Sequence, residues 1–110
     1  MKFRIDQNRI IFRLSPAQWH QLLETGKIHE KTGLPGGMTL QYRVETAQKG
    51  AETGFCFQDN IFTFTLPRHL LEQHDKDLPS RAGICHEFIL EDGEKLNLSL
   101  QVDMKKGRKD

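Results

Sequence analysis

Alternating apolar and charged residues at the start of the chain predict a β-hairpin. The apolar positions change from odd to even numbering along this stretch: Phe3 and Ile5 are followed by Ile10, Phe12 and Leu14. Side chains of a strand alternate between its two faces, so a connection of even length within residues 6–9 is needed to bring these residues onto one face. That register sets Ile5 opposite Ile10 and Phe3 opposite Phe12. The other face then carries Lys2, Arg4, Ile11 and Arg13.

Two helices are predicted, and the first has clear signals at both ends. Ser15 is an N-cap residue, Gln18 completes a capping box, and Gly26 is a typical C-terminal stop, which together indicate a helix over residues 16–25. A second, less well capped helix is indicated at about residues 67–75 by the spacing of its apolar positions.

The remaining segments are strands and turns. In the last hairpin the apolar residues of both strands are even-numbered, which requires a loop of odd length. We therefore predict a three-residue loop over 91–93, with Gly93 in the left-handed conformation of a bulge. The other predicted strands cover residues 27–32, 38–45, and a hairpin around the turn Asp59-Asn60, and the last hairpin covers about 82–91 and 94–104.

The predicted order strand-strand-helix-strand-strand occurs twice and suggests an internal repeat. A shift of 52 residues superimposes the first hairpin on the stretch around residues 55–66, and a shift of 57 or 58 brings His29 over His86 in the later strands. We expect an α+β, mostly β fold of about eight antiparallel strands and two short helices, in which the strands form either a barrel or two layers. Whether the two halves are related by a pseudo-two-fold axis is left open. Residues 1–104 are expected to form a single globular domain, followed by a disordered basic tail over 105–110.

Composition narrows the classes of partner. Sixteen Lys and Arg against fifteen Asp and Glu give a net charge of +1, so no overall field attracts nucleic acid, which is an unlikely partner. No apolar run is long enough for a transmembrane helix or a secretory signal, so we expect no membrane partner and a cytoplasmic location. Cys56 and Cys85 have no metal-binding spacing and are expected to be reduced, buried thiols.

The first candidate for chemistry is a basic stripe on the N-terminal hairpin. Lys2, Arg4 and Arg13 share one predicted face, with Arg9 near the turn, and such a group of cations can bind phosphate or sulfate. The alternative is that these residues form only the solvated face of an antiparallel sheet. The sequence leaves both interpretations open.

Two His-Glu pairs are the second candidate. Imidazole and carboxylate groups can bind transition metals, so His29 and His86 are weak candidates for ligands. However, neighbouring residues of a strand point to opposite faces, so a histidine and the glutamate after it do not easily share one site. We therefore expect no metal site and no cofactor. The glycine-containing loop over 32–37 lacks the lysine of a P-loop and is interpreted as a turn.

Short motifs along most of the chain resemble a family of small, uncharacterised bacterial proteins of unknown function. They are the start M-K-F-R-I-x-x-N-x-I-x-F-R-L-S, the stretch Pro-Gly-Gly-x-x-Leu-x-Tyr, the stretch Phe-x-Asp-Asn-x-Phe-Thr-Phe-x-Leu-Pro-Arg, and Ala-Gly-Ile. This sequence has Ile11 where the family usually shows arginine. The resemblance implies a cytoplasmic domain, and it supplies no activity and no binding residues.

The sequence thus favours a non-enzymatic binding or accessory domain whose partner is an unknown protein or small ligand, with homodimer formation left open. The alternative is a domain that binds an anion such as phosphate or a nucleotide, or hydrolyses it, through the basic face of Lys2, Arg4, Arg9 and Arg13. No catalytic residue is identified, and whether the protein is an enzyme is left uncertain.

Overall fold

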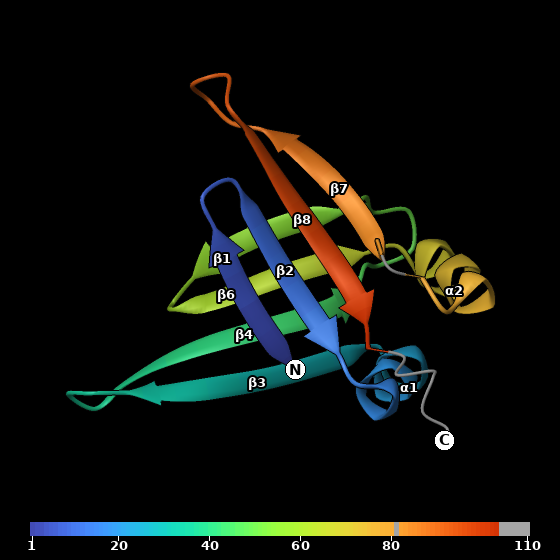
Figure 1. Cartoon of the computed structure of the whole chain (residues 1–110), viewed down its shortest axis with the longest axis horizontal. Helices are drawn as coiled ribbons and strands as arrows, with labels where there is room; N and C mark the ends of the chain where they lie inside the picture. The colour runs from blue at the N-terminus through green and yellow to red at the C-terminus, as the bar shows by residue number, and fades with distance from the viewer. Residues whose placement is uncertain (81, 104–110) are drawn as a thin grey trace. The chain divides into compact units, whose positions relative to one another are not determined.

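A computed structural model describes residues 1–80 and 82–103, and this part of the chain contains eight strands and two helices (Figure 1). The predicted α+β, mostly β class is confirmed. The strands form two separate four-stranded sheets, so the closed barrel among the expected arrangements is not formed. The predicted tail over residues 105–110 lies outside the described residues. In chain order the elements are β1 (Lys2–Asp6), β2 (Arg9–Leu14), α1 (Pro16–Thr25), β3 (Lys27–Leu34), β4 (Met38–Thr46), β5 (Gly54–Gln58), β6 (Ile61–Leu66), α2 (Arg68–Asp77), β7 (Ile84–Ile89) and β8 (Lys95–Val102).

The chain divides into two compact units, each built around one sheet. The first unit comprises Met1–Trp19 with Gln73–Asp110 and contains the sheet β1-β2-β8-β7; the second, His20–Glu72, contains the sheet β3-β4-β6-β5 (Figure 1). The first sheet therefore joins a hairpin from the N-terminal half of the chain to one from the C-terminal half, as does the second. A single domain over residues 1–104 stays a prediction.

The direction of the two central strand pairs differs from the prediction of antiparallel strands. The four hairpins are antiparallel as expected, whereas β2 runs parallel to β8, and β4 runs parallel to β6. A short turn forces its two strands to be antiparallel, but it says nothing about how one hairpin pairs with another. The apolar pattern determines which face of each strand is buried. It does not determine which strand of another hairpin pairs with it, or in which direction that strand runs.

The turns confirm the hairpin registers deduced from parity. Phe3 pairs with Phe12 across the first hairpin, and the turn of the third has left-handed backbone at Asp59 and Asn60. Residues 91–93 form a three-residue loop, in which Gly93 has a φ of 89° and donates its N–H to the carbonyl of Leu90 (2.9 Å). Hairpin loop length was therefore readable from the odd and even numbering of apolar residues.

The capping box of α1 is present as predicted. The N–H of Gln18 donates to the hydroxyl of Ser15 (3.2 Å), and the N–H of Ser15 donates to the side-chain oxygen of Gln18 (3.0 Å). At the other end, Gly26 has a φ of 83° and donates its N–H to the carbonyl of Leu22 (2.8 Å). Both ends of the helix thus find hydrogen-bond partners locally.

The two sheets have the same topology, which supports the repeat suggested by the sequence. A shift of 52 residues converts the register of Phe3 and Phe12 into that of Phe55 and Phe64. In the later strands the shift is 56, because Ile28 pairs with Val44 and Ile84 pairs with Leu100. The order β1-β2-β8-β7 then becomes β5-β6-β4-β3, which is the second sheet read from its other edge.

The predicted alignment of His29 with His86 is wrong. With the observed shift of 56, His29 corresponds to Cys85, and His86 corresponds to Glu30. A shift of 57 would exchange the two faces of the strand, which the buried residues do not allow. The local similarity of the two His-Glu pairs therefore does not reflect equivalent positions.

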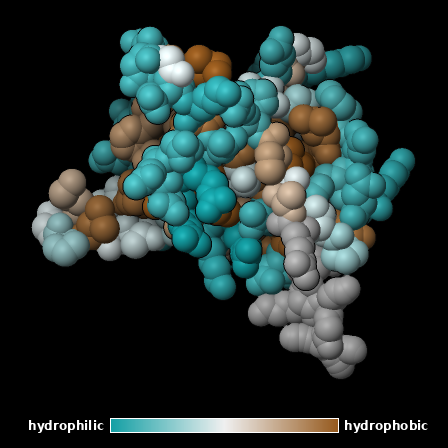
Figure 2. Space-filling model, turned by 45° about the horizontal axis from the view of Figure 1, so that its top comes forward, coloured by the Kyte–Doolittle hydropathy of each residue, from teal (hydrophilic) through white to brown (hydrophobic). Residues whose placement is uncertain are grey.

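Each sheet has one apolar, buried face. Phe12, Leu98 and Leu100 are completely buried in the first sheet, as are Val44 and Phe64 in the second. Figure 2 shows scattered brown, hydrophobic areas on the face that it draws. The large apolar side chains that remain exposed among the described residues include Ile5, Leu34, Met38, Phe57, Ile89 and Leu90. Neither α1 nor α2 is long and apolar enough to span a membrane.

Candidate functional site

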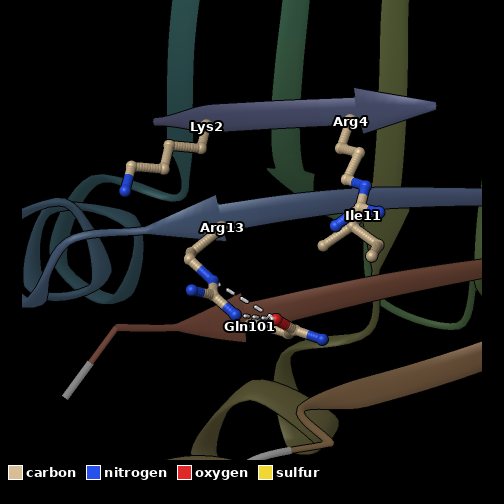
Figure 3. Close-up of a pocket in the computed structure, with 5 residues that line it drawn as sticks. All are labelled: Lys2, Arg4, Ile11, Arg13 and Gln101. Carbon is tan, nitrogen blue, oxygen red and sulfur yellow. Dashed lines mark hydrogen bonds between the residues drawn. The ribbon is translucent and has the colours of Figure 1, made fainter.

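The outer face of the first sheet carries a small pocket built from three adjacent strands. Its volume is about 170 Å³, and it is lined by Lys2 and Arg4 of β1, Ile11 and Arg13 of β2, and Gln101 of β8 (Figure 3). Three of its five lining residues are cations, and none is acidic. The structure thus brings together three of the four residues of the predicted basic stripe.

Strand register explains why these side chains meet. Lys2 lies opposite Arg13, and Arg4 lies opposite Ile11, in the antiparallel ladder of β1 and β2. The parallel ladder of β2 and β8 then places Gln101 beside Arg13. Because residues two apart share a face, the five side chains project from the side of the sheet opposite the buried residues.

A bifurcated hydrogen bond fixes Arg13 to Gln101. The Nη2 and Nε groups of Arg13 donate to the side-chain oxygen of Gln101 at 2.8 and 3.3 Å (Figure 3). A guanidinium has no acceptor, so Gln101 must turn its oxygen toward Arg13. Its NH₂ group is thereby left as a further hydrogen-bond donor at the pocket.

The positive charge of the pocket is poorly compensated. Lys2 and Arg13, which lie directly opposite each other, form no ion pair with a carboxylate in the part of the chain that the structure describes. Arg4 approaches Asp6 at 3.7 Å, but both side chains are largely exposed and Asp6 does not line the pocket. Exposed pairs at this distance contribute little, so Arg4 keeps most of its attraction for another anion.

Arg9, the fourth residue of the predicted stripe, shares the face but not the pocket. It lies at the far end of β2, opposite Asp6. Gln101, in contrast, lines the pocket and was missed by the sequence analysis, because its strand was not known to pair with β2. The available signal was that Gln101 alternates with the apolar residues of β8 and so had to face outward.

The second sheet provides an internal comparison, since its topology is the same. The positions corresponding to Lys2, Arg4 and Arg13 are occupied by Gly54, Cys56 and Thr65. The topology and register therefore form without cations at these positions. The presence of three cations on the outer face of the first sheet is therefore not explained by the requirements of the fold.

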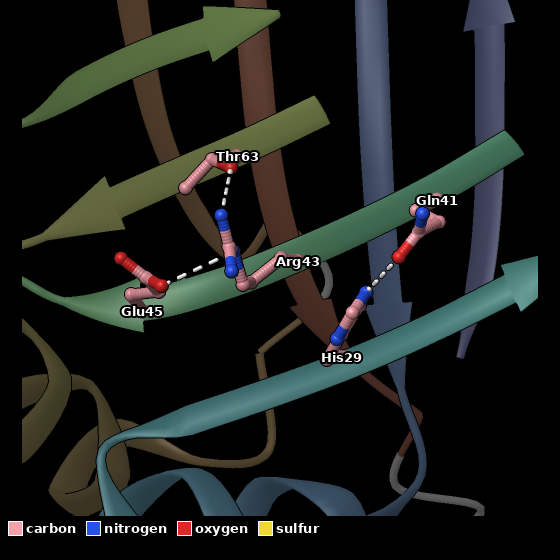
Figure 4. A network of polar contacts seen from close by, with 5 residues as sticks. All are labelled: His29, Gln41, Arg43, Glu45 and Thr63. Atoms are coloured by element: carbon pink, nitrogen blue, oxygen red, sulfur yellow. Dashed lines mark hydrogen bonds and ion pairs between the residues drawn. The ribbon is translucent and has the colours of Figure 1, made fainter. Parts of the chain in front are cut away.

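Different contacts occupy the outer face of the second sheet (Figure 4). The Nε of Arg43 lies 3.1 Å from the Oε2 of Glu45, and the two groups form an ion pair without the alignment of a hydrogen bond. The Nη2 of Arg43 donates a hydrogen bond to the hydroxyl of Thr63 at 3.4 Å. The ring of His29 forms a hydrogen bond with Gln41 at 2.7 Å (Figure 4). Here a carboxylate faces the guanidinium at the sheet surface, unlike in the pocket of the first sheet.

The structure does not bring the two weak metal candidates together in one sheet. His29 belongs to β3 of the second sheet, and His86 belongs to β7 of the first, where its ring centre lies 4.5 Å from that of Phe88. The described residues contain no group of three or more His, Cys, Asp or Glu side chains with the geometry of a metal site. Cys56 and Cys85 are unpaired, and both are exposed rather than buried as expected.

Beyond the pocket, a buried histidine stands out in the first unit. His74 of α2 is 7% exposed and packs edge-on against Trp19, with ring centres 5.7 Å apart. Burial lowers its pKa from 6.5, while Asp77 and Asp75 oppose that shift. The indole N–H of Trp19 donates to Asp75 at 2.7 Å, and the Nε2 of His74 is buried without a hydrogen-bond partner.

A larger cavity in the second unit has a weaker claim to function. Its volume is about 540 Å³, and it lies between residues 46–51 and the start of α2 at residues 67–69. Arg68, which lines it, already donates to the carbonyl of Leu23 (3.0 Å) and to Glu72 (3.1 Å). The smaller pocket of the first unit therefore has the more available charge.

Comparison with known proteins identifies the family. Residues 1–107 match the family described as "Family of unknown function (DUF7009)", and the chain belongs to that family. No curated protein and no solved structure matches the chain.

Proposed function

Since membership of a family of unknown function supplies no activity, we propose that this protein is a binding module that holds an oxyanion on the outer face of the sheet β1-β2-β8-β7. One observation carries the proposal: Lys2, Arg4 and Arg13 surround one pocket that has no acidic residue in its lining. The corresponding positions of the second sheet hold no cation. The proposal keeps the cytoplasmic setting expected from the sequence.

Binding by these side chains has a clear physical basis. Guanidinium and ammonium groups form charge-assisted hydrogen bonds with phosphate and sulfate oxygens, and Arg13 is already held in place by Gln101. The site is open to solvent, so each contact contributes only about 1 kcal/mol and a simple anion should bind with a Kd on the order of 1 mM. A larger ligand that also contacts Ile11 would bind more tightly.

Binding is favoured over catalysis by the chemistry of the pocket. Lysine, arginine, glutamine and isoleucine line it, and the lining that the structure describes contains no histidine, carboxylate, cysteine or serine, the usual general bases and nucleophiles of enzymes. They supply charge and hydrogen-bond donors, which hold and orient an anion. The module is therefore proposed as a non-enzymatic one.

Thermal unfolding in phosphate and sulfate tests the proposal. The melting temperature should rise with either anion relative to chloride of equal ionic strength, because a ligand that binds only the folded state stabilises it. Arg4→Gln and Arg13→Gln should each reduce that rise. Lys31→Gln, which removes an exposed cation from β3 of the second unit, is the matched control and should keep the full response.

Two outcomes would contradict oxyanion binding at this face. One is a melting temperature that depends on ionic strength alone, with phosphate, sulfate and chloride equivalent. The other is a specific response that survives in the Arg4→Gln/Arg13→Gln double variant and would place the anion elsewhere.

A further inference from the structure

The geometry points to a particular class of ligand for the pocket formed by Lys2, Arg4, Ile11, Arg13 and Gln101. This class is an oxyanion without a hydroxyl group, and a sulfate ester is its simplest example. This inference rests on the proposed oxyanion binding and names the class of anion that the site selects. We assign the selection to Gln101, whose amide is oriented by Arg13.

Every polar side chain of the pocket presents donors. Lysine and arginine have no acceptor atoms at all. The one acceptor among the side chains, the oxygen of Gln101, is occupied by two N–H groups of Arg13. Main-chain carbonyls of the central strand β2 are engaged in ladders with β1 and β8. The carboxylate of Asp6 is directed to Arg4 and does not line the pocket.

A pocket whose polar side chains offer only donors distinguishes between anions of equal charge. A phosphate monoester in its monoanionic form carries one O–H group, which requires an acceptor or must remain in solvent. A sulfate monoester has the same charge and tetrahedral shape but only acceptor oxygens. A phosphodiester shares that property. The pocket should therefore favour the two hydroxyl-free groups over the protonated phosphate.

The second sheet shows what an acidic residue does at the position of Gln101. Glu45 occupies the corresponding position of β4, and it lies 3.1 Å from the guanidinium of Arg43. Arg43 lies on the same strand as Glu45, whereas Arg13 lies beside residue 101 on the neighbouring strand β2. A carboxylate at residue 101 would therefore also lie next to a guanidinium, would compensate its charge and would add an acceptor. The neutral amide instead holds Arg13 in place and leaves its charge available.

Titration with methyl sulfate and methyl phosphate tests this selection. The measurement is the change in backbone amide NMR shifts of β1, β2 and β8 at about pH 5, below the second pKa of about 6 for a phosphate ester, where both ligands are monoanions. Methyl sulfate should bind about fivefold or more tightly than methyl phosphate, because the protonated oxygen of the phosphate stays in solvent and the pocket loses about one charge-assisted hydrogen bond. Above about pH 7, where the phosphate loses its hydroxyl, that preference should disappear or reverse.

Dimethyl phosphate distinguishes the two hydroxyl-free classes of ligand, which are sulfate monoesters and phosphodiesters. Binding equal to that of methyl sulfate supports the inference and extends the ligand class to phosphodiesters. Weaker binding than methyl sulfate, while still tighter than methyl phosphate, supports the inference and favours sulfate esters. Binding of methyl phosphate as tightly as methyl sulfate at about pH 5 overturns it.

The variant Gln101→Glu tests the role of the amide. Methyl sulfate binding should weaken about tenfold or more, because the new carboxylate repels the ligand and pairs with Arg13. Gln41→Glu, the same change on the outer face of the second sheet, should alter binding less than about twofold. Unchanged methyl sulfate binding in Gln101→Glu would refute the assignment to Gln101.

Failure of the inference is distinguishable from failure of the proposed function. If none of the anions shifts the amides around Lys2, Arg4 and Arg13, oxyanion binding itself is wrong and the inference falls with it. If all of the anions bind there equally well, the proposed function stands and only the selection is wrong. Circular dichroism at each pH confirms that the variants remain folded.

Discussion

Removal of the charge of Lys2 should stabilise the protein. Lys2 lies directly opposite Arg13, and like charges at directly opposed positions of a sheet destabilise it. Lys2 forms no hydrogen bond or ion pair within the described residues, so Lys2→Gln removes repulsion and leaves every described polar contact in place. A gain in stability on this change would show that the fold does not need the charge of Lys2.

An upper limit on the magnitude follows from the spacing of opposed residues in a sheet. Charges at the Cβ spacing of about 5 Å would repel each other in water by about 0.8 kcal/mol, and salt at about 0.1 M reduces this to about 0.5 kcal/mol. The guanidinium of Arg13 turns toward Gln101 (Figure 3), so the free energy of unfolding of Lys2→Gln should exceed that of the wild type by at most this amount. With a urea slope of about 1.5 kcal/mol/M, the unfolding midpoint rises by at most about 0.3 M.

The same hairpin contains the matched control. Arg9 lies opposite Asp6, so Arg9→Gln removes an attraction and should lower the urea midpoint by a similar amount. Both shifts should become small at about 1 M salt, where the screening length is about 3 Å. A midpoint that falls in Lys2→Gln, or a rise that is unaffected by salt, would refute the electrostatic reasoning.

Two further predictions concern the first unit. Gly83→Ala should cost about 3 kcal/mol in the free energy of unfolding, since Gly83 has a φ of 75° and a new Cβ would collide with the carbonyl of Leu100. Gly93→Ala, at a φ of 89° in open space, should cost only about 1 kcal/mol in the same urea measurement, and equal costs would contradict this account. Burial lowers the pKa of His74 from 6.5, so stability should be fully present above that pH and should fall as the pH drops below it, because protons then bind the unfolded chain more readily. His74→Gln should flatten this part of the pH profile of the urea midpoint, and an unchanged profile would exclude His74 as its source.

Local features of the fold were predictable from the sequence. The numbering of apolar residues set the register of Phe3 with Phe12 and the three-residue loop before Glu94, because both depend on the strict alternation of side chains in a strand. The ends of α1 were equally clear, since Ser15 and Gln18 supply the hydrogen bonds that its first turn lacks. In these cases the cause acts within a few residues of the chain.

Pairing between hairpins was not predictable in the same way. Arg13 and Gln101 are neighbours in the parallel ladder of β2 and β8, although they are 88 residues apart in the sequence. Any amphipathic strand can satisfy the buried face of another, and the pattern alone does not select the partner or its direction. The same limit applies to the candidate site. The odd and even numbering of residues predicted that the cations of one hairpin share a face, whereas the place of Gln101 beside them depends on the parallel pairing.

The two sheets together separate what the fold requires from what the site requires. Their shared topology keeps apolar residues at corresponding buried positions, such as Phe12 and Phe64, so these positions are explained by packing. Their outer faces differ, and a face that is free to vary without loss of the fold can acquire binding residues. At the position where the second sheet has Glu45 beside a guanidinium, the first has Gln101, which holds Arg13 without cancelling its charge. That exchange of a carboxylate for an amide, together with the cations Lys2, Arg4 and Arg13, distinguishes the face of the proposed oxyanion site from the outer face of the second sheet.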